Sequence, residues 1–188
     1  MAIFDASKKP GWFLEGKEFP GRPTGDDSGI LFYNAEGDEC GGLMFGSRQM
    51  PDGTPFQALL LTFDAFRQDQ VLALRAADHD GVRDVTIDML SRPRHSLVKD
   101  VQMLEAVDAM PEGVERDAAR ERANEDLAAA GHAHRLRIGM SQDGSVAIQL
   151  NDSKGQSRIR ISVDEKDNPR IEFLDGDGHV VYSLPPAP

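Results

Sequence analysis

The chain has 188 residues, 39% of them hydrophobic, and its 32 Asp and Glu against 21 Lys and Arg give a formal charge of −11. This length and hydrophobic content suit one folded domain over residues 1–188 rather than two. The acidic balance repels phosphate backbones and anionic lipids, which argues against nucleic-acid binding and against membrane contact by the chain itself. The short basic stretch Arg92, Arg94 and His95 is interpreted as a solvated loop.

The single cysteine, Cys40, excludes an intramolecular disulfide and any CxxC motif, and its apolar neighbours indicate a small buried thiol. No apolar stretch approaches the roughly 20 residues that a membrane helix needs. No signal-peptide pattern follows Lys8 and Lys9. Residues 2–4 resemble the end of a strand, so we expect the chain to be a trimmed form of a longer protein.

Short β-strands are predicted along the first half of the chain. Apolar runs at residues 43–45, 58–63 and 71–74 are typical of strands, and Pro51-Asp52-Gly53 predicts a turn between the first two. Residues 30–43 and 74–87 also fit, weakly, a strand–turn–strand repeat that is clearer later in the chain.

Residues 96–130 are predicted to form a helical insertion. Ser96 is a suitable N-cap, and apolar residues follow it at a spacing of three and four. Pro111 then interrupts the pattern, because proline cannot continue a helix. A second, polar and Ala-rich helix is predicted over about 112–130, with Gly131 as its C-terminal cap.

The last third of the chain alternates polar and apolar residues between turns rich in Asp and Gly, which is typical of antiparallel strands with one apolar face. Eight positions also have a like-for-like counterpart 23 residues later, beginning with Ile138 and Ile161 and ending with Ile161 and Leu184. This match predicts a duplicated strand–turn–strand unit. The Asp and Gly of each turn are explained by turn geometry, since Gly adopts positive φ without steric cost and Asp accepts backbone N–H groups.

Together these elements predict a mainly β protein, an antiparallel meander of short strands with 23-residue repeats and a helical insertion at about 96–130. The repeat sets the strand spacing but not how the sheet closes, so a barrel, a sandwich and a solenoid are all open. The oligomeric state is open as well, although a meander leaves edge strands that need covering or pairing.

The most distinctive local string runs from Phe63 to Val71. It places Asp64 and Asp69 five residues apart beside bulky apolar residues, with Gln70 next to them. Two carboxylates beside one cleft could divide acid and base roles, as in glycoside hydrolysis, or bind a carbohydrate. The favoured interpretation is that they cap a corner between strands, paired with Arg67 or with backbone N–H groups. The three residues are therefore candidates for binding, and no residue is assigned a catalytic role.

A second candidate is His132-Ala133-His134, because residues i and i+2 of a strand point to the same face and two imidazoles can hold zinc or copper with a third ligand. A solvated strand entrance is the favoured alternative. The acidic turn from Asp175 to Gly178 suggests calcium, but no Glu stands at the twelfth position counted from Asp175, as an EF-hand requires. No cofactor is assigned.

Residues 29–46 resemble a family of uncharacterised bacterial proteins through the string GxLFYNxEGxExGGLxFG, and residues 61–70 resemble the same family through LxFDxxxQDQ. Residues 16–20 are similar to an upstream motif of that family. Many members carry an N-terminal hydrophobic anchor, so the resemblance implies an envelope protein if a longer precursor carries such an anchor, and otherwise a cytoplasmic one. The resemblance implies no particular biochemical activity.

The residues favour a non-enzymatic β-repeat module with a structural or interaction role, in which exposed aromatic strand faces bind a protein or glycan partner. The resemblance implies that such a module belongs to the bacterial cell envelope. The alternative is a carbohydrate-binding protein or hydrolase with a cleft around Asp64 and Asp69. A metal-dependent binder using His132 and His134 is a third hypothesis.

Overall fold

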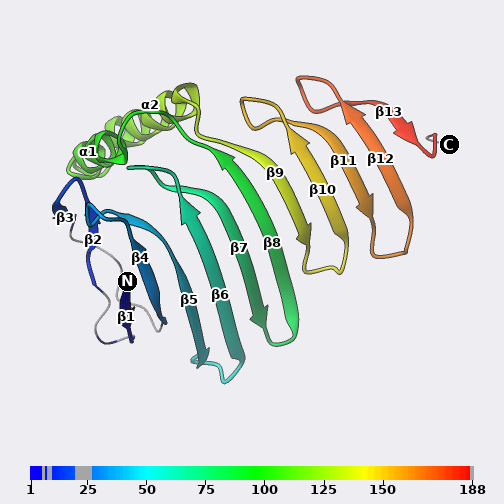
Figure 1. The fold of residues 1–188 in the computed structure, drawn as a ribbon. Helices are drawn as coiled ribbons and strands as arrows, with labels where there is room; N and C mark the ends of the chain where they lie inside the picture. The colour runs from blue at the N-terminus through cyan, green and yellow to red at the C-terminus, as the bar shows by residue number, and fades with distance from the viewer. Residues whose placement is uncertain (6, 8–9, 20–26, 187–188) are drawn as a thin grey trace.

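The computed structural model describes residues 1–5, 7, 10–19 and 27–186, and these form a mainly β fold (Figure 1). Eleven strands make one antiparallel sheet in the order β1-β4-β5-β6-β7-β8-β9-β10-β11-β12-β13. The strands are β1 (Ala2–Phe4), β4 (Ser28–Tyr33), β5 (Glu39–Gln49), β6 (Pro55–Asp64), β7 (Gln70–His79), β8 (Val82–Ser91), β9 (Ala133–Met140), β10 (Val146–Asn151), β11 (Ser157–Val163), β12 (Pro169–Leu174) and β13 (Val180–Leu184). The three strands predicted in the first half are confirmed as parts of β5, β6 and β7.

The sheet is a single open layer (Figure 1). From β4 onward each strand pairs with the next one along the chain, so the meander prediction is confirmed. Of the three arrangements that the repeat left open, the closed barrel is not formed, because β1 and β13 lie at opposite edges and do not pair. In the part of the chain that the structure describes, no helix has the length and apolarity required to cross a bilayer.

The 23-residue repeat corresponds to a step of two strands across the sheet. Ile138 on β9 lies opposite Ile148 on β10, which lies opposite Ile161 on β11. The same row continues through Ile171 to Leu184 on β13. Residues 23 apart therefore stand in one row on the same face, which is why the repeat conserves residue size and polarity.

The turns of the repeat are built as the Asp and Gly positions predict. In the turn after β10, Asp152 Oδ1 accepts the backbone N–H groups of Lys154 and Gln156 at 2.9 and 3.1 Å, and Gly155 has φ +84°. The pKa of Asp152 is lowered, first by the hydrogen bond from Lys154 N–H. Asp164 and Asp175 accept backbone N–H groups in the same way in the following turns.

A close approach of three strands requires glycine. Gly41 on β5 has φ +128°, and a Cβ built there would overlap the carbonyl group of Thr62 on β6. A Cβ on Gly29 of β4 would likewise overlap the carbonyl oxygen of Leu43 on β5. Thr62 uses the space, because its hydroxyl accepts the N–H of Gly42 at 3.1 Å. Gly29 and Gly41 of the string at residues 29–46 therefore have a packing role.

The predicted insertion is confirmed as two helices between β8 and β9, α1 (Leu97–Asp108) and α2 (Val114–Ala130), which lie across one end of the sheet (Figure 1). Ser96 caps α1, since its hydroxyl accepts the N–H of Val98 at 3.3 Å. Gly131 ends α2 in the left-handed conformation with φ +106°.

A small two-stranded sheet, β2 (Trp12–Leu14) and β3 (Lys17–Phe19), lies at the same end. Its Leu14 is buried, as are Phe4 of β1 and Leu31 of β4. Leu31 projects from the face opposite that of its neighbour Ile30, so this buried group is on one side of the large sheet.

Candidate functional site

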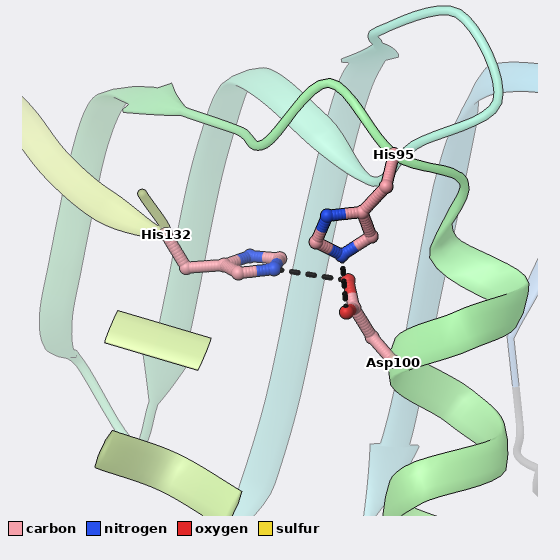
Figure 2. Close-up of side chains that lie close together, drawn as sticks. All are labelled: His95, Asp100 and His132. Atoms are coloured by element: carbon pink, nitrogen blue, oxygen red, sulfur yellow. Dashed lines mark hydrogen bonds and ion pairs between the residues drawn. The ribbon is translucent and has the colours of Figure 1, made fainter. Parts of the chain in front are cut away.

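A buried polar cluster joins the helices to the end of the sheet (Figure 2). Asp100, in the first turn of α1, is 5% exposed. Its Oδ1 lies 2.6 Å from His95 Nε2, and its Oδ2 lies 3.0 Å from His132 Nε2. Gln68, from the turn between β6 and β7, donates its amide to the same Oδ2 at 3.3 Å. The carboxylate thus connects three segments that are far apart in the sequence: the turn at Gln68, the start of the insertion at residues 95–100, and His132.

The proton positions in this cluster follow from Arg92. A guanidinium only donates hydrogen bonds, and Arg92 NH1 lies 3.1 Å from His132 Nδ1. Nδ1 must therefore be the accepting nitrogen, which leaves the ring proton on Nε2, where it is donated to Asp100. His132 is held as a donor to a carboxylate.

Burial alone would raise the pKa of Asp100, but hydrogen bonds from His95, Gln68 and His132 stabilise the charged form, and the net shift is downward. Asp100 is therefore a carboxylate at neutral pH, and side chains of the protein donate the hydrogen bonds that stabilise it. Because those donors come from both ends of the helical insertion, the cluster fixes the insertion against the sheet.

The two histidines proposed as metal ligands are not brought together. His132 lies just before β9 and contacts Asp100, whereas His134, on β9, has its Nδ1 3.4 Å from Asp88 Oδ1. His132 instead belongs to a set with ligand atoms within 4.8 Å of one another, formed with His95 and Asp100. A metal on Nε2 of His132 would need the lone pair that the present tautomer lacks, and Arg92 would add a positive charge beside it. The geometry therefore suits a hydrogen-bonded anchor better than a metal centre.

The basic stretch before α1 differs from expectation. The side chain of Arg92 is only 12% exposed, and its Nε donates to the carbonyl of Gln70 at 2.7 Å. His95 contacts Asp100. These two residues do not belong to a solvated loop, because the insertion brings Asp100 and His132 over them. In the sequence, the one sign of a structural role for Arg92 and His95 is that they lie just before the Ser96 cap. The sequence does not indicate the contact of Arg92 with His132, because His132 is more than 30 residues away.

The predicted binding residues Asp64, Asp69 and Gln70 lie together. They line a cleft of about 280 Å³ at the helical end of the sheet, and the other residues of its wall are Trp12, Phe13, Leu14, Glu39, Gln68, Leu97 and Val101. Asp69 pairs with a backbone N–H group, one of the two expected partners, since it accepts the N–H of Gln70 at 2.9 Å. Its ion pair, at 3.2 Å, is with Arg92 and not with Arg67.

Arg67 instead connects two other turns. Its Nε lies 3.4 Å from Oδ2 of Asp38, which is 1% exposed, and its NH2 lies 2.9 Å from Glu36. Asp38 Oδ1 also accepts the N–H of Glu15 at 2.6 Å. The turns after β2, β4 and β6 are tied together by this group, so the string from Phe63 to Val71 has a clear structural role.

The acidic turn between β12 and β13 has no such burial. Asp175, Asp177 and His179 have ligand atoms within 4.8 Å of one another, but Asp175 Oδ1 accepts the N–H groups of Asp177 and His179, both at 2.9 Å. His179 Nδ1 lies 3.3 Å from Asp175 Oδ2. Hydrogen bonds of the turn account for this group.

The most extensive feature is one face of the large sheet, which we call the apolar face. Its central row takes one residue from each of the eleven strands, and every one is Ile or Leu: Ile3, Ile30, Leu43, Leu61, Leu74, Ile87, Ile138, Ile148, Ile161, Ile171 and Leu184. Two flanking rows complete it: Phe63, Leu72, Met89, Leu136, Leu150, Ile159, Phe173 and Tyr182 on one side, and Phe45, Leu59, Ala76, Val85, Met140, Val146 and Val163 on the other.

No second layer of the described residues covers the apolar face. Twelve of its large side chains between β5 and β13 are 38% to 56% exposed, with Ile138 and Phe173 at the lower limit and Tyr182 at the upper, and the other large side chains of these strands are half-buried. All eight isoleucines of the chain belong to it. Strands β8 to β11 also form a shallow apolar groove on this face. Its lining includes Val85, Ile87, Ile138, Met140, Ile148 and Ile161.

The opposite face of strands β8 to β12 is charged. Asp88 on β8 lies 3.5 Å from Arg137 on β9, and Arg160 on β11 lies 2.7 Å from Glu172 on β12. Opposite charges on neighbouring strands stabilise such a face. The two faces therefore differ in chemistry over these strands, whereas at β1 and β4 the opposite face holds the buried residues Phe4 and Leu31. Comparison of the chain with protein-family models, with curated proteins and with solved structures finds no match.

Proposed function

We propose that this protein is a non-enzymatic interaction module that binds its partner through the apolar face. The observation that carries the proposal is the uninterrupted central row of Ile and Leu on all eleven strands of a one-layer sheet. A sheet normally buries its apolar face against another layer.

The size of the surface supports this function. Strands lie about 4.8 Å apart, and residues on one face of a strand lie about 6.6 Å apart, so the 26 positions of the three rows cover roughly 800 Å². The largest apolar patch of a typical monomer is about 300–600 Å². The apolar face is thus larger than the area that scattered hydrophobic residues expose on a monomer. Its size suits an association surface.

Two neighbouring residues of β10 provide the test, because they project from opposite faces. Leu150 is on the apolar face and 40% exposed, whereas Gln149 lies between Arg137 and Arg160 on the charged face. We expect Leu150→Glu to weaken association through the apolar face at least tenfold, because the new carboxylate would lose its water in the contact. Gln149→Glu should change association less than twofold.

The readouts are fluorescence of the apolar dye ANS bound to dilute protein, and molecular mass by light scattering at increasing concentration. Circular dichroism melting checks that both variants are folded. If Leu150→Glu matched Gln149→Glu in dye binding and in mass, the apolar face would not be an association surface.

A second candidate function is binding of a small polyhydroxylated ligand in the cleft of about 280 Å³ at the helical end. Carboxylate and amide groups of Asp64, Asp69 and Gln70 line it beside Trp12, and acceptors beside an aromatic ring suit a sugar. Binding is favoured over hydrolysis, because Asp69 is engaged by Arg92 and by the N–H of Gln70.

Saturation-transfer NMR with a panel of monosaccharides tests this second candidate. We expect signal transfer from wild type and at least a tenfold weaker affinity in Trp12→Ala, which removes the aromatic wall. Tyr182→Ala, on the apolar face, is the matched aromatic control and should bind as wild type. Absence of transfer to every sugar in wild type would contradict the candidate.

A further inference from the structure

We propose that the partner of the apolar face is a second copy of this chain, packed face to face as a two-layer β-sandwich. This inference rests on the proposed function and names its partner. Two open sheets stacked about 10 Å apart give each copy the second layer that the described part of one chain does not supply.

The area of the face fits such a dimer. A specific complex buries about 800 Å² on each partner, and obligate homodimers bury more through interfaces that resemble a divided core. The roughly 800 Å² of the apolar face matches the area of a specific complex. A dimer related by a two-fold axis also needs one surface that is complementary to itself. Rows of Ile, Leu and Val meet this need, since any apolar row can pack against any other.

The distribution of charge permits two copies to pack face to face. No charged residue occurs in the three rows of the apolar face, so two copies meet without desolvating an ion. The net charge of −11 repels an anionic bilayer and a second copy alike, but in the sandwich the charged groups lie on the outer faces and on the insertions. The ion pairs Asp88–Arg137 and Arg160–Glu172 would remain in water on the outer faces of the sandwich.

The helical insertion sets the relative orientation of the two copies. Residues 97–130 contain nine acidic and four basic residues, so this segment holds a charge of −5 out of the total of −11. The insertion lies at one end of the strands (Figure 1). Turning one copy end for end places the two acidic insertions at opposite ends of the sandwich and minimises their repulsion. In that orientation the central row of one copy lies over the central row of the other.

Light scattering and methyl NMR test this arrangement on the native chain. We expect a mass about twice the 20.6 kDa of one chain at micromolar concentration. Because all eight isoleucines lie on the apolar face, isoleucine methyl groups are specific probes of it. A sample of mixed labelled and unlabelled copies should give intermolecular nuclear Overhauser effects at Ile87, Ile138 and Ile148.

Ile138→Glu should shift the mass to that of one chain, while Gln149→Glu keeps the dimer. Three outcomes would overturn the inference: a single-chain mass for wild type, a dimer without intermolecular effects at isoleucine, or a single chain that binds vesicles through this face. A monomer that binds ANS through a Leu150-dependent surface would refute only the second copy and leave the proposed function standing. A monomer without such binding would refute both.

Discussion

Gly41→Ala is expected to lower the free energy of unfolding by about 3 kcal/mol or more. Two terms add at this position: the positive φ of +128° costs an L-residue about 1–2 kcal/mol, and the new Cβ overlaps the backbone of Thr62. Forcing atoms into a packed site adds about 1–3 kcal/mol. For a chain of this length the melting temperature should fall by about 10 °C, measured by circular dichroism.

Gly37 provides the matched control in the same β4–β5 hairpin. It also has a positive φ, of +87°, but nothing lies within 4 Å of a Cβ built there. Gly37→Ala should therefore show the conformational term alone, about 1 kcal/mol. Equal losses in the two variants would show that β5 and β6 do not approach as closely as described.

Asp100→Asn is expected to have an effect of similar size on the anchoring of the helical insertion. The amide can accept from one partner through its oxygen, but its NH2 group would face a second donor, either His95 or His132. The tautomer of His132 cannot adjust easily while Arg92 donates to Nδ1. A buried donor without an acceptor and a broken network cost about 3 kcal/mol. Urea unfolding followed by far-ultraviolet circular dichroism measures this loss.

The control for that variant is Asp108→Asn on the same helix. Asp108 pairs with Arg120, its side chain is 65% exposed, and it lies at the C-terminal end of α1. An exposed pair contributes about 0–1 kcal/mol, and a negative charge at a helix C-terminus is mildly unfavourable. Asp108→Asn should therefore leave stability nearly unchanged. A loss as large as that of Asp100→Asn would show that any acid on α1 matters equally.

Acidification gives a further check on the role of Asp100. Its folded pKa is lowered, so its contribution to stability is present above the ordinary unfolded value of about 3.9 and is lost as the pH falls through the folded value. The stability difference between wild type and Asp100→Asn should hence be largest near neutral pH and shrink below about pH 4. The turn carboxylates Asp152, Asp164 and Asp175 titrate equally in both proteins and cancel in the difference.

The anchor and the apolar face have complementary consequences for function. The cluster around Asp100 holds the acidic insertion at one end of the strands, where Phe63 and Met89 of the apolar face still remain 46% exposed. The insertion therefore leaves the apolar face accessible. It also places like charge where it can orient a second copy, which links the stability of the anchor to the geometry of the proposed assembly.

The sequence by itself determined the local features of this protein. Period-2 alternation and Asp/Gly turns are encoded by neighbouring residues, so the strands, the hairpins and the 23-residue repeat were predictable, as were the Ser96 and Gly131 caps. The shared position of Asp64, Asp69 and Gln70 was also predictable, because a short turn keeps residues close together.

Only the tertiary structure decided how those local features are arranged relative to one another in space. His95, Asp100 and His132 meet because a two-helix insertion folds back on the sheet, and no short-range pattern encodes that return. Likewise, alternation predicts that each strand has an apolar side, but it does not say whether another layer of the same chain covers that side. Among the described residues no second layer covers the apolar side of the sheet, because the insertion lies at the end of the strands.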